Sequence, residues 1–262
     1  MDKIERFFLT LHSDMPRQGP GSPSTTAVAL SMIESFSPGF SGKKDLQILD
    51  VGCGPGMQTV QLAEHFTGAK VKALDYYPQF LDELTDSAVA RGLSKRIDPV
   101  EGSMFEMAFA EESFDVLWSE GAVYIIGFER GLKEWKRFVK PGGFMAVSEI
   151  SWLTDSRPAE LEAFWTSEYP GIDTVAGNMA KIQAAGYSPI GAYVFPPRDW
   201  FDHYYNPLLE RISLCRGIAE RDRDNSAELL GILEAEEHEI ELFRKYSGYY
   251  SYAFYLMRRP DS

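Results

Sequence analysis

The stretch of residues 47–59, QILDVGCGPGMQT, constrains the fold more than any other part of the chain. It begins with a short apolar run of the kind that a buried parallel strand needs. Gly52, Gly54 and Gly56 follow at alternate positions, and apolar residues then recur at helical spacing as far as Gly68. The stretch therefore predicts a strand, a glycine-rich turn and a helix. Such a turn lets a ligand approach closely, and the start of the helix offers it unpaired N–H groups.

An acidic residue, Asp75, lies about one strand–helix–strand unit further on, at the end of the second apolar run. A carboxylate in this position can accept hydrogen bonds from both hydroxyls of a ribose. The glycines fall at i, i+2 and i+4, whereas nicotinamide-binding folds use i, i+2 and i+5. A glycine turn that holds no ligand is the alternative interpretation.

The motif in residues 50–56, DVGCGPG, followed by Asp75, resembles the cofactor motif of class I S-adenosylmethionine-dependent methyltransferases. The resemblance is closest to the small-molecule branch that includes ubiquinone and menaquinone methyltransferases, and residues 114–115 (FD) and 140–143 (KPGG) add to it. It implies an α/β, Rossmann-like fold: a seven-stranded, mostly parallel sheet with an antiparallel last strand and helices on both faces. It also implies S-adenosylmethionine as the cofactor and in-line methyl transfer to a small-molecule acceptor, on an O, N, S or C atom.

The resemblance places the cofactor on the glycine-rich turn and on the ends of the next strands. Tyr76 would pack on the adenine, unless its ring points to solvent. Family members usually carry an Asp near Ser103 that accepts from the adenine amine, so here the Ser103 hydroxyl or a backbone carbonyl must replace it. Cys53 is interpreted as the small residue that the turn needs. The expected cofactor-binding residues are Asp50, Gly52, Cys53, Gly54, Gly56, Gln58, Thr59, Asp75, Tyr76, Gly102, Ser103, Met104, Ser119 and Glu120.

The predicted fourth strand, residues 113–119, ends at a carboxylate, Glu120. Open α/β sheets bind ligands beyond the carboxyl ends of their strands, so Glu120 and Tyr124 should lie beside the reacting end of the cofactor. Glu120 could take a proton from the acceptor or pair with a cationic substrate. The alternative is that it caps the next turn or binds Arg17. With His203, a base that titrates near neutral pH, Glu120 and Tyr124 form the catalytic candidates.

Two N-terminal helices are expected before the first strand. One covers residues 2–14, with Asp2 as a possible cap, and the other begins near Ser24 or Thr25 and runs to Phe36. By the resemblance they form a lid over the cofactor. The loop of residues 17–22 would then face the pocket, with Arg17 for a carboxylate and Ser22 for a hydrogen bond, whereas a surface turn is the alternative.

About fifty residues separate the predicted strands 187–195 and 249–257, and they indicate two or three helices. At their start lie Trp200, His203, Tyr204 and Tyr205, which either roof the substrate pocket or pack the insertion on the sheet.

Elsewhere a fifth strand is expected over residues 144–150, and Asp173 is expected to cap a helix that stops at Gly186. The expected substrate-binding residues are Arg17, Gly19, Ser22, Trp152, Trp200 and Tyr204. The domain prediction is a lid (1–40), a core (41–198 and 248–259) and a helical insertion (199–247) within one structural domain.

Composition narrows the classes of partner. A net charge of −13 over 262 residues argues against nucleic acid and against an anionic membrane surface. The two cysteines form no disulfide or zinc pattern, and no metal site is expected. No run of residues suits a signal peptide or a bilayer span, so we expect a cytoplasmic protein. We leave open whether it forms a homodimer. Two other functions compete: an S-adenosylmethionine-binding regulatory or partner subunit without activity, and a nicotinamide oxidoreductase.

Overall fold

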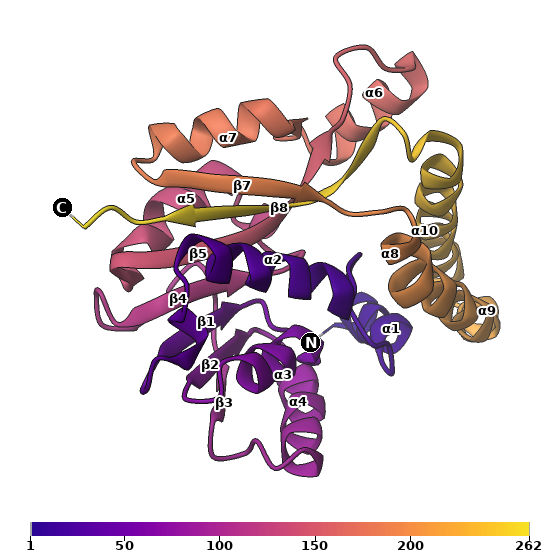
Figure 1. Ribbon diagram of the computed structural model, residues 1–262. Helices are drawn as coiled ribbons and strands as arrows, with labels where there is room; N and C mark the ends of the chain where they lie inside the picture. Colours follow the sequence, from indigo (N-terminus) through magenta and orange to yellow (C-terminus); the bar gives the residue numbers. More distant parts are fainter. Residues whose placement is uncertain (1, 262) are drawn as a thin grey trace.

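The computed structural model describes residues 2–261, which build one mixed sheet flanked by helices (Figure 1). The strand order is β3-β2-β1-β4-β5-β8-β7, and β6 pairs with β5 beside this path. All strands run parallel except β8, which is antiparallel to both of its neighbours. The predicted Rossmann-like fold is therefore confirmed. The strands are β1 (Gln47–Val51), β2 (Lys70–Asp75), β3 (Ile97–Glu101), β4 (Phe114–Ser119), β5 (Val139–Trp152), β6 (Asp173–Thr174), β7 (Ser188–Val194) and β8 (Tyr250–Arg258).

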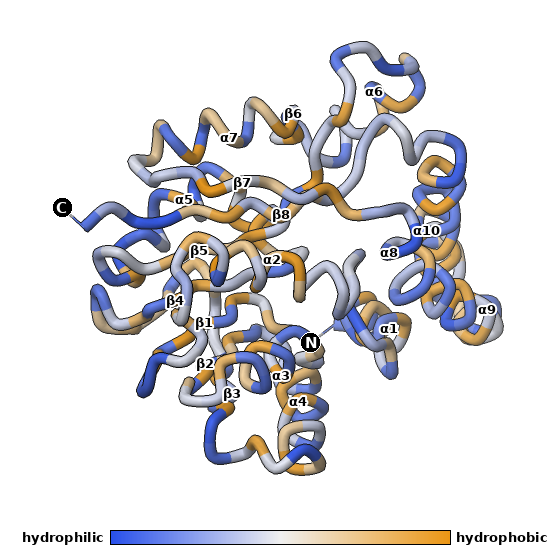
Figure 2. Tube along the Cα trace, viewed as in Figure 1, coloured by the Kyte–Doolittle hydropathy of each residue, from blue (hydrophilic) through white to orange (hydrophobic). Residues whose placement is uncertain are grey.

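The central strands are apolar on both faces, and neighbouring residues of one strand enter different cores. In β1, Ile48 packs in the core on one side of the sheet and Leu49 in the core on the other, because side chains alternate along a strand. Figure 2 shows the apolar residues concentrated in these strands. The strand β3 forms one edge of the sheet, where Pro99, which has no N–H to donate, is tolerated.

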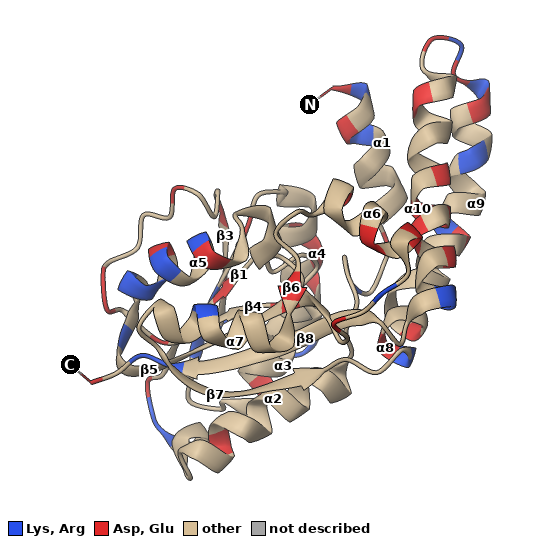
Figure 3. Ribbon diagram, turned by 90° about the horizontal axis from the view of Figure 1, so that it is seen from above, with Lys and Arg blue, Asp and Glu red and all other residues tan. Residues whose placement is uncertain are grey.

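Helices cover both faces of the sheet. On one face lie α2 (Pro23–Phe36), α3 (Met57–His65) and α4 (Pro78–Ala90), and on the other lie α5 (Phe128–Trp135) and α7 (Val175–Ala184). Their charged residues point outward, and Figure 3 shows Lys, Arg, Asp and Glu mainly on the peripheral helices, whereas β7 and most of β8 are free of them. Short 3-10 turns occupy η1 (Phe40–Gly42), η2 (Val123–Ile125) and η3 (Lys136–Phe138).

A separate group of helices stands at one end of the sheet. It contains α1 (Lys3–His12), α9 (Asn206–Arg221) and α10 (Ser226–Tyr246), with α6 (Ala159–Glu168) nearby (Figures 1 and 3). A short helix, α8 (Arg198–Trp200), and a π-helical turn, η4 (Phe201–Tyr205), lead directly into α9. The Arg211 guanidinium of α9 donates hydrogen bonds to the Thr10 carbonyl and to the Ser13 hydroxyl, the latter at 2.7 Å. The N-terminal helix is thus attached to the insertion.

Several predicted boundaries were wrong for local reasons. The fifth strand, expected over residues 144–150, also includes residues 140–143: β5 begins at Val139 because that residue pairs with Phe114 of β4. Asp173 does not cap α7: it belongs to β6 and pairs with Lys181, and the Thr174 hydroxyl accepts from the Gly177 N–H instead. The two-residue strand β6 was not predicted. Within residues 2–261, none of the helices is both long enough and apolar enough to cross a bilayer.

Candidate active site

A cavity of about 450 Å³ opens beyond the carboxyl ends of β1, β2 and β4. Its floor is the glycine-rich turn after β1, and its sides come from the segments that follow β2, β3 and β4. Residues of the N-terminal lid close it, among them Phe8, His12 and Arg17. The strand ends of an open α/β sheet therefore form the pocket where the sequence analysis expected it. No group of three or more potential metal-ligating side chains occurs within residues 2–261.

The three glycines of the turn serve different purposes. All three have positive φ, at 70° for Gly52, 52° for Gly54 and 86° for Gly56, a region that side chains rarely occupy. A Cβ on Gly52 would overlap Ala122, and one on Gly56 would overlap Leu84, so these two glycines allow close packing. Gly54 lines the cavity together with Gly52, whereas Gly56 lies outside the lining.

Asp75, at the end of β2, supports this turn and also lines the cavity. Its Oδ2 accepts from the Gly54 N–H at 2.8 Å, and its Oδ1 accepts from the Tyr77 N–H at 3.0 Å. Burial raises the pKa of Asp75, while the backbone N–H bonds oppose that rise. Each carboxylate oxygen can accept a second hydrogen bond. Asp75 therefore fits a vicinal diol such as that of a ribose.

Asp50, Thr59 and Ser119 lie behind the cavity wall and do not line it. The Thr59 hydroxyl donates to Asp50 Oδ2 at 2.6 Å, and the Ser119 hydroxyl donates to the Val51 carbonyl at 2.8 Å. Burial raises the pKa of Asp50 to about 7. These predicted cofactor contacts thus hold the turn and the strand ends from within the core. Gln58 lines the cavity, and its amide donates to the Cys53 carbonyl at 2.9 Å.

The residues expected around the adenine lie together on the wall after β2 and β3. Gly102, Ser103 and Met104 line the cavity, as does Tyr76. The Tyr76 residue is 64% exposed, so its ring lies at the open rim, where an aromatic face is available for stacking. Its role on the adenine stays a prediction.

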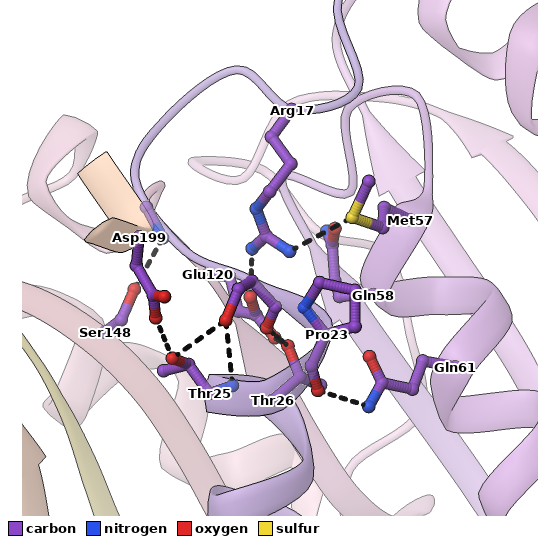
Figure 4. A network of polar contacts seen from close by, with 12 residues as sticks. Arg17, Pro23, Thr25, Thr26, Met57, Gln58, Gln61, Glu120, Ser148 and Asp199 are labelled. Atoms are coloured by element: carbon purple, nitrogen blue, oxygen red, sulfur yellow. Dashed lines mark hydrogen bonds and ion pairs between the residues drawn. The ribbon is translucent and has the colours of Figure 1, made fainter. Parts of the chain in front are cut away.

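A buried ion pair joins the lid to the end of β4 (Figure 4). The Arg17 guanidinium donates to Glu120 Oε2, and both side chains are almost fully buried. Glu120 Oε1 accepts from the Thr26 hydroxyl at 2.9 Å and from the Trp118 indole N–H at 2.8 Å. Both carboxylate oxygens are therefore engaged within the protein, which corresponds to the alternative that Glu120 binds Arg17.

A second attachment joins the lid to the insertion. Ser22 is the N-cap of α2, because its hydroxyl accepts from the Thr25 N–H at 3.1 Å, and Pro23 opens the helix. The Thr25 hydroxyl donates to Asp199, and the Gly21 N–H donates to the Asp199 carbonyl at 3.1 Å. Ser22, a predicted substrate residue, is thus a helix cap outside the cavity lining, whereas Gly19 lines the cavity.

The aromatic residues expected over the substrate lie away from the cavity lining, with the exception of Tyr124. Trp200 stacks on Phe243 with ring centroids 4.1 Å apart and donates to the Ser251 hydroxyl at 2.9 Å. Trp152 packs under the Arg157 guanidinium, and Tyr204 is buried against Tyr205. His203 is half-buried and does not line the cavity. Trp200 therefore packs the insertion on the sheet.

The sequence analysis missed several cavity residues, among them His12. His12 is 4% exposed, and neither ring nitrogen has a hydrogen-bond partner in the part of the chain that the structure describes. Its Nε2 lies 4.0 Å from Oε1 of Glu236 in α10. Burial lowers the pKa of His12 to about 4, and the side chain of Gln18 nearby opposes that fall. The spacing of Ile4, Phe8 and His12 on one face of the predicted first helix was the available signal.

Comparison with known proteins agrees with this geometry. Residues 48–143 match the family model of a methyltransferase domain. A sterol 24-C-methyltransferase from Neurospora crassa is 38% identical over 112 residues, which are 42% of this chain and 29% of that protein. The methyltransferase GfsG from Streptomyces halstedii is 29% identical over 53% of this chain and 52% of its own length. The matches thus span about half or less of these relatives.

Two solved structures resemble the whole chain. A methyltransferase from Geobacter sulfurreducens in complex with S-adenosyl-L-homocysteine aligns with a TM-score of 0.79 at 16% identity, over 96% of this chain and 97% of that one. The [4+2]-cyclase SpnF aligns with a TM-score of 0.74 at 18% identity, over 99% and 93%. The chain thus shares the fold of the predicted class, and its residues 48–143 match a methyltransferase domain. Assignment to the ubiquinone and menaquinone branch stays a prediction.

Proposed function

We propose that the protein is an S-adenosylmethionine-dependent methyltransferase that methylates a small molecule. The observation that carries this proposal is the Asp75 carboxylate in the cavity wall, next to the open backbone of Gly54. A nucleoside seated there has a ribose acceptor in Asp75 and an aromatic surface in Tyr76. Residues 102–104 border the same space.

The cofactor supplies a methyl group that its sulfonium already activates. The protein therefore has mainly to hold the acceptor atom behind that methyl group, at about 3–3.5 Å. Asp75 and the glycine-rich turn fix the nucleoside, and Arg17, a buried cation in the wall, is available to the cofactor's carboxylate or to that of a substrate. The lid, held by Arg17 and Asp199, covers the reacting end and excludes water.

A small-molecule acceptor is consistent with the relatives, whose names include sterol methyltransferases. It also suits the size of the cavity, which lies in the range of small-molecule sites. The similarity to a cyclase means that cofactor binding alone does not establish methyl transfer. The test must therefore measure binding and transfer separately.

The binding experiment is calorimetry with S-adenosylhomocysteine on the wild-type protein, Asp75→Asn and Asp86→Asn. Asp86 is an exposed carboxylate on α4 and serves as the matched control. We expect wild-type affinity for Asp86→Asn and at least tenfold weaker binding for Asp75→Asn. The transfer experiment follows the label from methyl-labelled S-adenosylmethionine into a metabolite extract. Binding without transfer would favour the regulatory-subunit alternative, and folded protein that gives no heat would contradict the proposal.

A further inference from the structure

The cofactor contacts leave His12 unused, a cavity residue of the N-terminal helix that has Glu236 of α10 beside it. We propose that His12, oriented by Glu236, is the general base that takes a proton from the methyl acceptor. The acceptor atom is then a nitrogen or an oxygen that carries hydrogen. This inference rests on the proposed methyltransferase function and adds the substrate class and a catalytic residue.

The first support is the unsatisfied imidazole. Buried polar side chains almost always have hydrogen-bond partners, and an unpaired one is costly. His12 is buried in the cavity wall, and both of its ring nitrogens lack a partner within residues 2–261. The residue is nevertheless held in place, because Gln18 donates to its carbonyl at 2.9 Å and the Phe8 ring packs on it with centroids 4.3 Å apart. A fixed imidazole without a partner is ready to accept a hydrogen bond from a ligand.

The second support is the carboxylate beside it. Glu236 Oε1 lies 4.0 Å from Nε2, so a small movement of either side chain makes an Nε2–H···O bond. That bond leaves Nδ1 as the nitrogen with a free lone pair. A carboxylate in this position orients the ring and stabilises the imidazolium that forms on proton transfer. Burial and the neighbouring Glu239 raise the pKa of Glu236 to about 7, so it is partly ionised at neutral pH.

Tyr124 lines the cavity near the same group of carboxyl groups. Burial raises the pKa of Tyr124, and the nearby carboxyl groups of Glu239, Glu236 and Glu149 add to the rise. Among the described residues, no lysine or arginine forms an ion pair with any of these three glutamates. A general base is useful only for an acceptor that still carries its proton, so the acceptor group is an amine or a hydroxyl.

The proposed step balances as follows. The acceptor N–H or O–H gives its proton to Nδ1 of His12, and its lone pair forms the bond to the methyl carbon. The carbon–sulfur bond breaks, and its electron pair remains on sulfur. The products are the methylated acceptor and S-adenosylhomocysteine, and His12 later releases the proton to water. The relatives named sterol 24-C-methyltransferases place the methyl group on carbon, so the inference separates this chain from them.

The test uses methyl-labelled S-adenosylmethionine with a mixture of a primary amine, a phenol, a sterol alkene and a metabolite extract. The variants are His12→Gln, His12→Ala with and without added imidazole, Glu236→Gln, and His238→Gln as the exposed control on α10. We expect label on nitrogen or oxygen and a loss of kcat of about 100-fold or more in His12→Gln. S-adenosylhomocysteine should bind this variant as it binds the wild type. Imidazole should restore part of the rate of His12→Ala, and Glu236→Gln should shift the pH profile of kcat.

Three results would overturn the inference: wild-type kcat in His12→Gln, label found only on carbon, or loss of activity in His12→Ala that imidazole does not restore. Wild-type protein that fails to bind S-adenosylhomocysteine would instead contradict the proposed function itself. Binding without label in any component would remove both proposals. The two failures are therefore distinguishable.

Discussion

A buried carboxyl group that has no partner should make the stability of this protein depend strongly on pH. Glu149 of β5 is 1% exposed, and neither of its oxygens has a hydrogen-bond partner in the described chain. Loss of solvation raises its pKa from 4.5 to about 8, against smaller opposing effects of Tyr169 and Lys181. The native state therefore keeps a proton that the unfolded chain releases. The contribution of Glu149 to stability is largest below pH 4.5 and is lost as the pH rises towards 8.

The size of this effect follows from the shift. At about 1.4 kcal/mol per pKa unit, the full shift of Glu149 is worth about 5 kcal/mol, of which about 4 kcal/mol lies between pH 5 and pH 9. Glu149→Gln removes the titrating group. We therefore expect the free energy of unfolding of this variant, relative to the wild type, to rise by about 4 kcal/mol between these pH values. The informative quantity is the change with pH in the stability difference between this variant and the wild type. The amide of the variant is itself buried without partners, and that cost is the same at every pH.

Urea unfolding at pH 5 and pH 9 measures this difference. Glu111→Gln is the control, because Glu111 is exposed and forms no ion pair in the described residues. The control variant should have the same free energy of unfolding as the wild type at both pH values. An equal stability difference between Glu149→Gln and the wild type at pH 5 and pH 9 would refute the reasoning, since it would mean that Glu149 is ionised in the native state at both.

Three further predictions concern the lid and the glycine-rich turn. Arg17→Met leaves Glu120 buried without its cation and should lower the free energy of unfolding, measured with urea, by about 3–5 kcal/mol. Adding Glu120→Gln to this variant should recover part of that free energy. Additive losses from the two substitutions would argue against a coupled pair. Gly56→Ala should lower the free energy of unfolding by about 2 kcal/mol or more, because the φ of Gly56 is positive and the added methyl group overlaps a leucine. Gly231→Ala is the control: Gly231 lies in a helix with open space around it, so this change should be neutral or stabilising. In calorimetry, Asp75→Asn should weaken S-adenosylhomocysteine binding by about 10- to 150-fold, as expected for lost hydrogen bonds to a charged group, and unchanged affinity would exclude Asp75 as the ribose acceptor.

The sequence by itself determined the part of the site that one local segment builds. The turn of residues 52–56 and Asp75 follow from a strand, a turn and a helix that are consecutive in the chain, so their spacing alone places them at one end of the sheet. Parallel neighbours then bring the end of β4 to the same edge. Local pattern was sufficient here because short connections leave few alternatives.

Only the tertiary structure decided which long-range partners meet. Periodicity shows that a helix has an apolar face, but it does not say which element covers that face. The sequence therefore left open whether Trp200 roofs the substrate pocket or packs the insertion on the sheet, and in the structure it stacks on Phe243. His12 went unnoticed because Glu236, its neighbour in the fold, lies near the other end of the chain, and only the packing of α1 beside the insertion brings the two together next to the cavity.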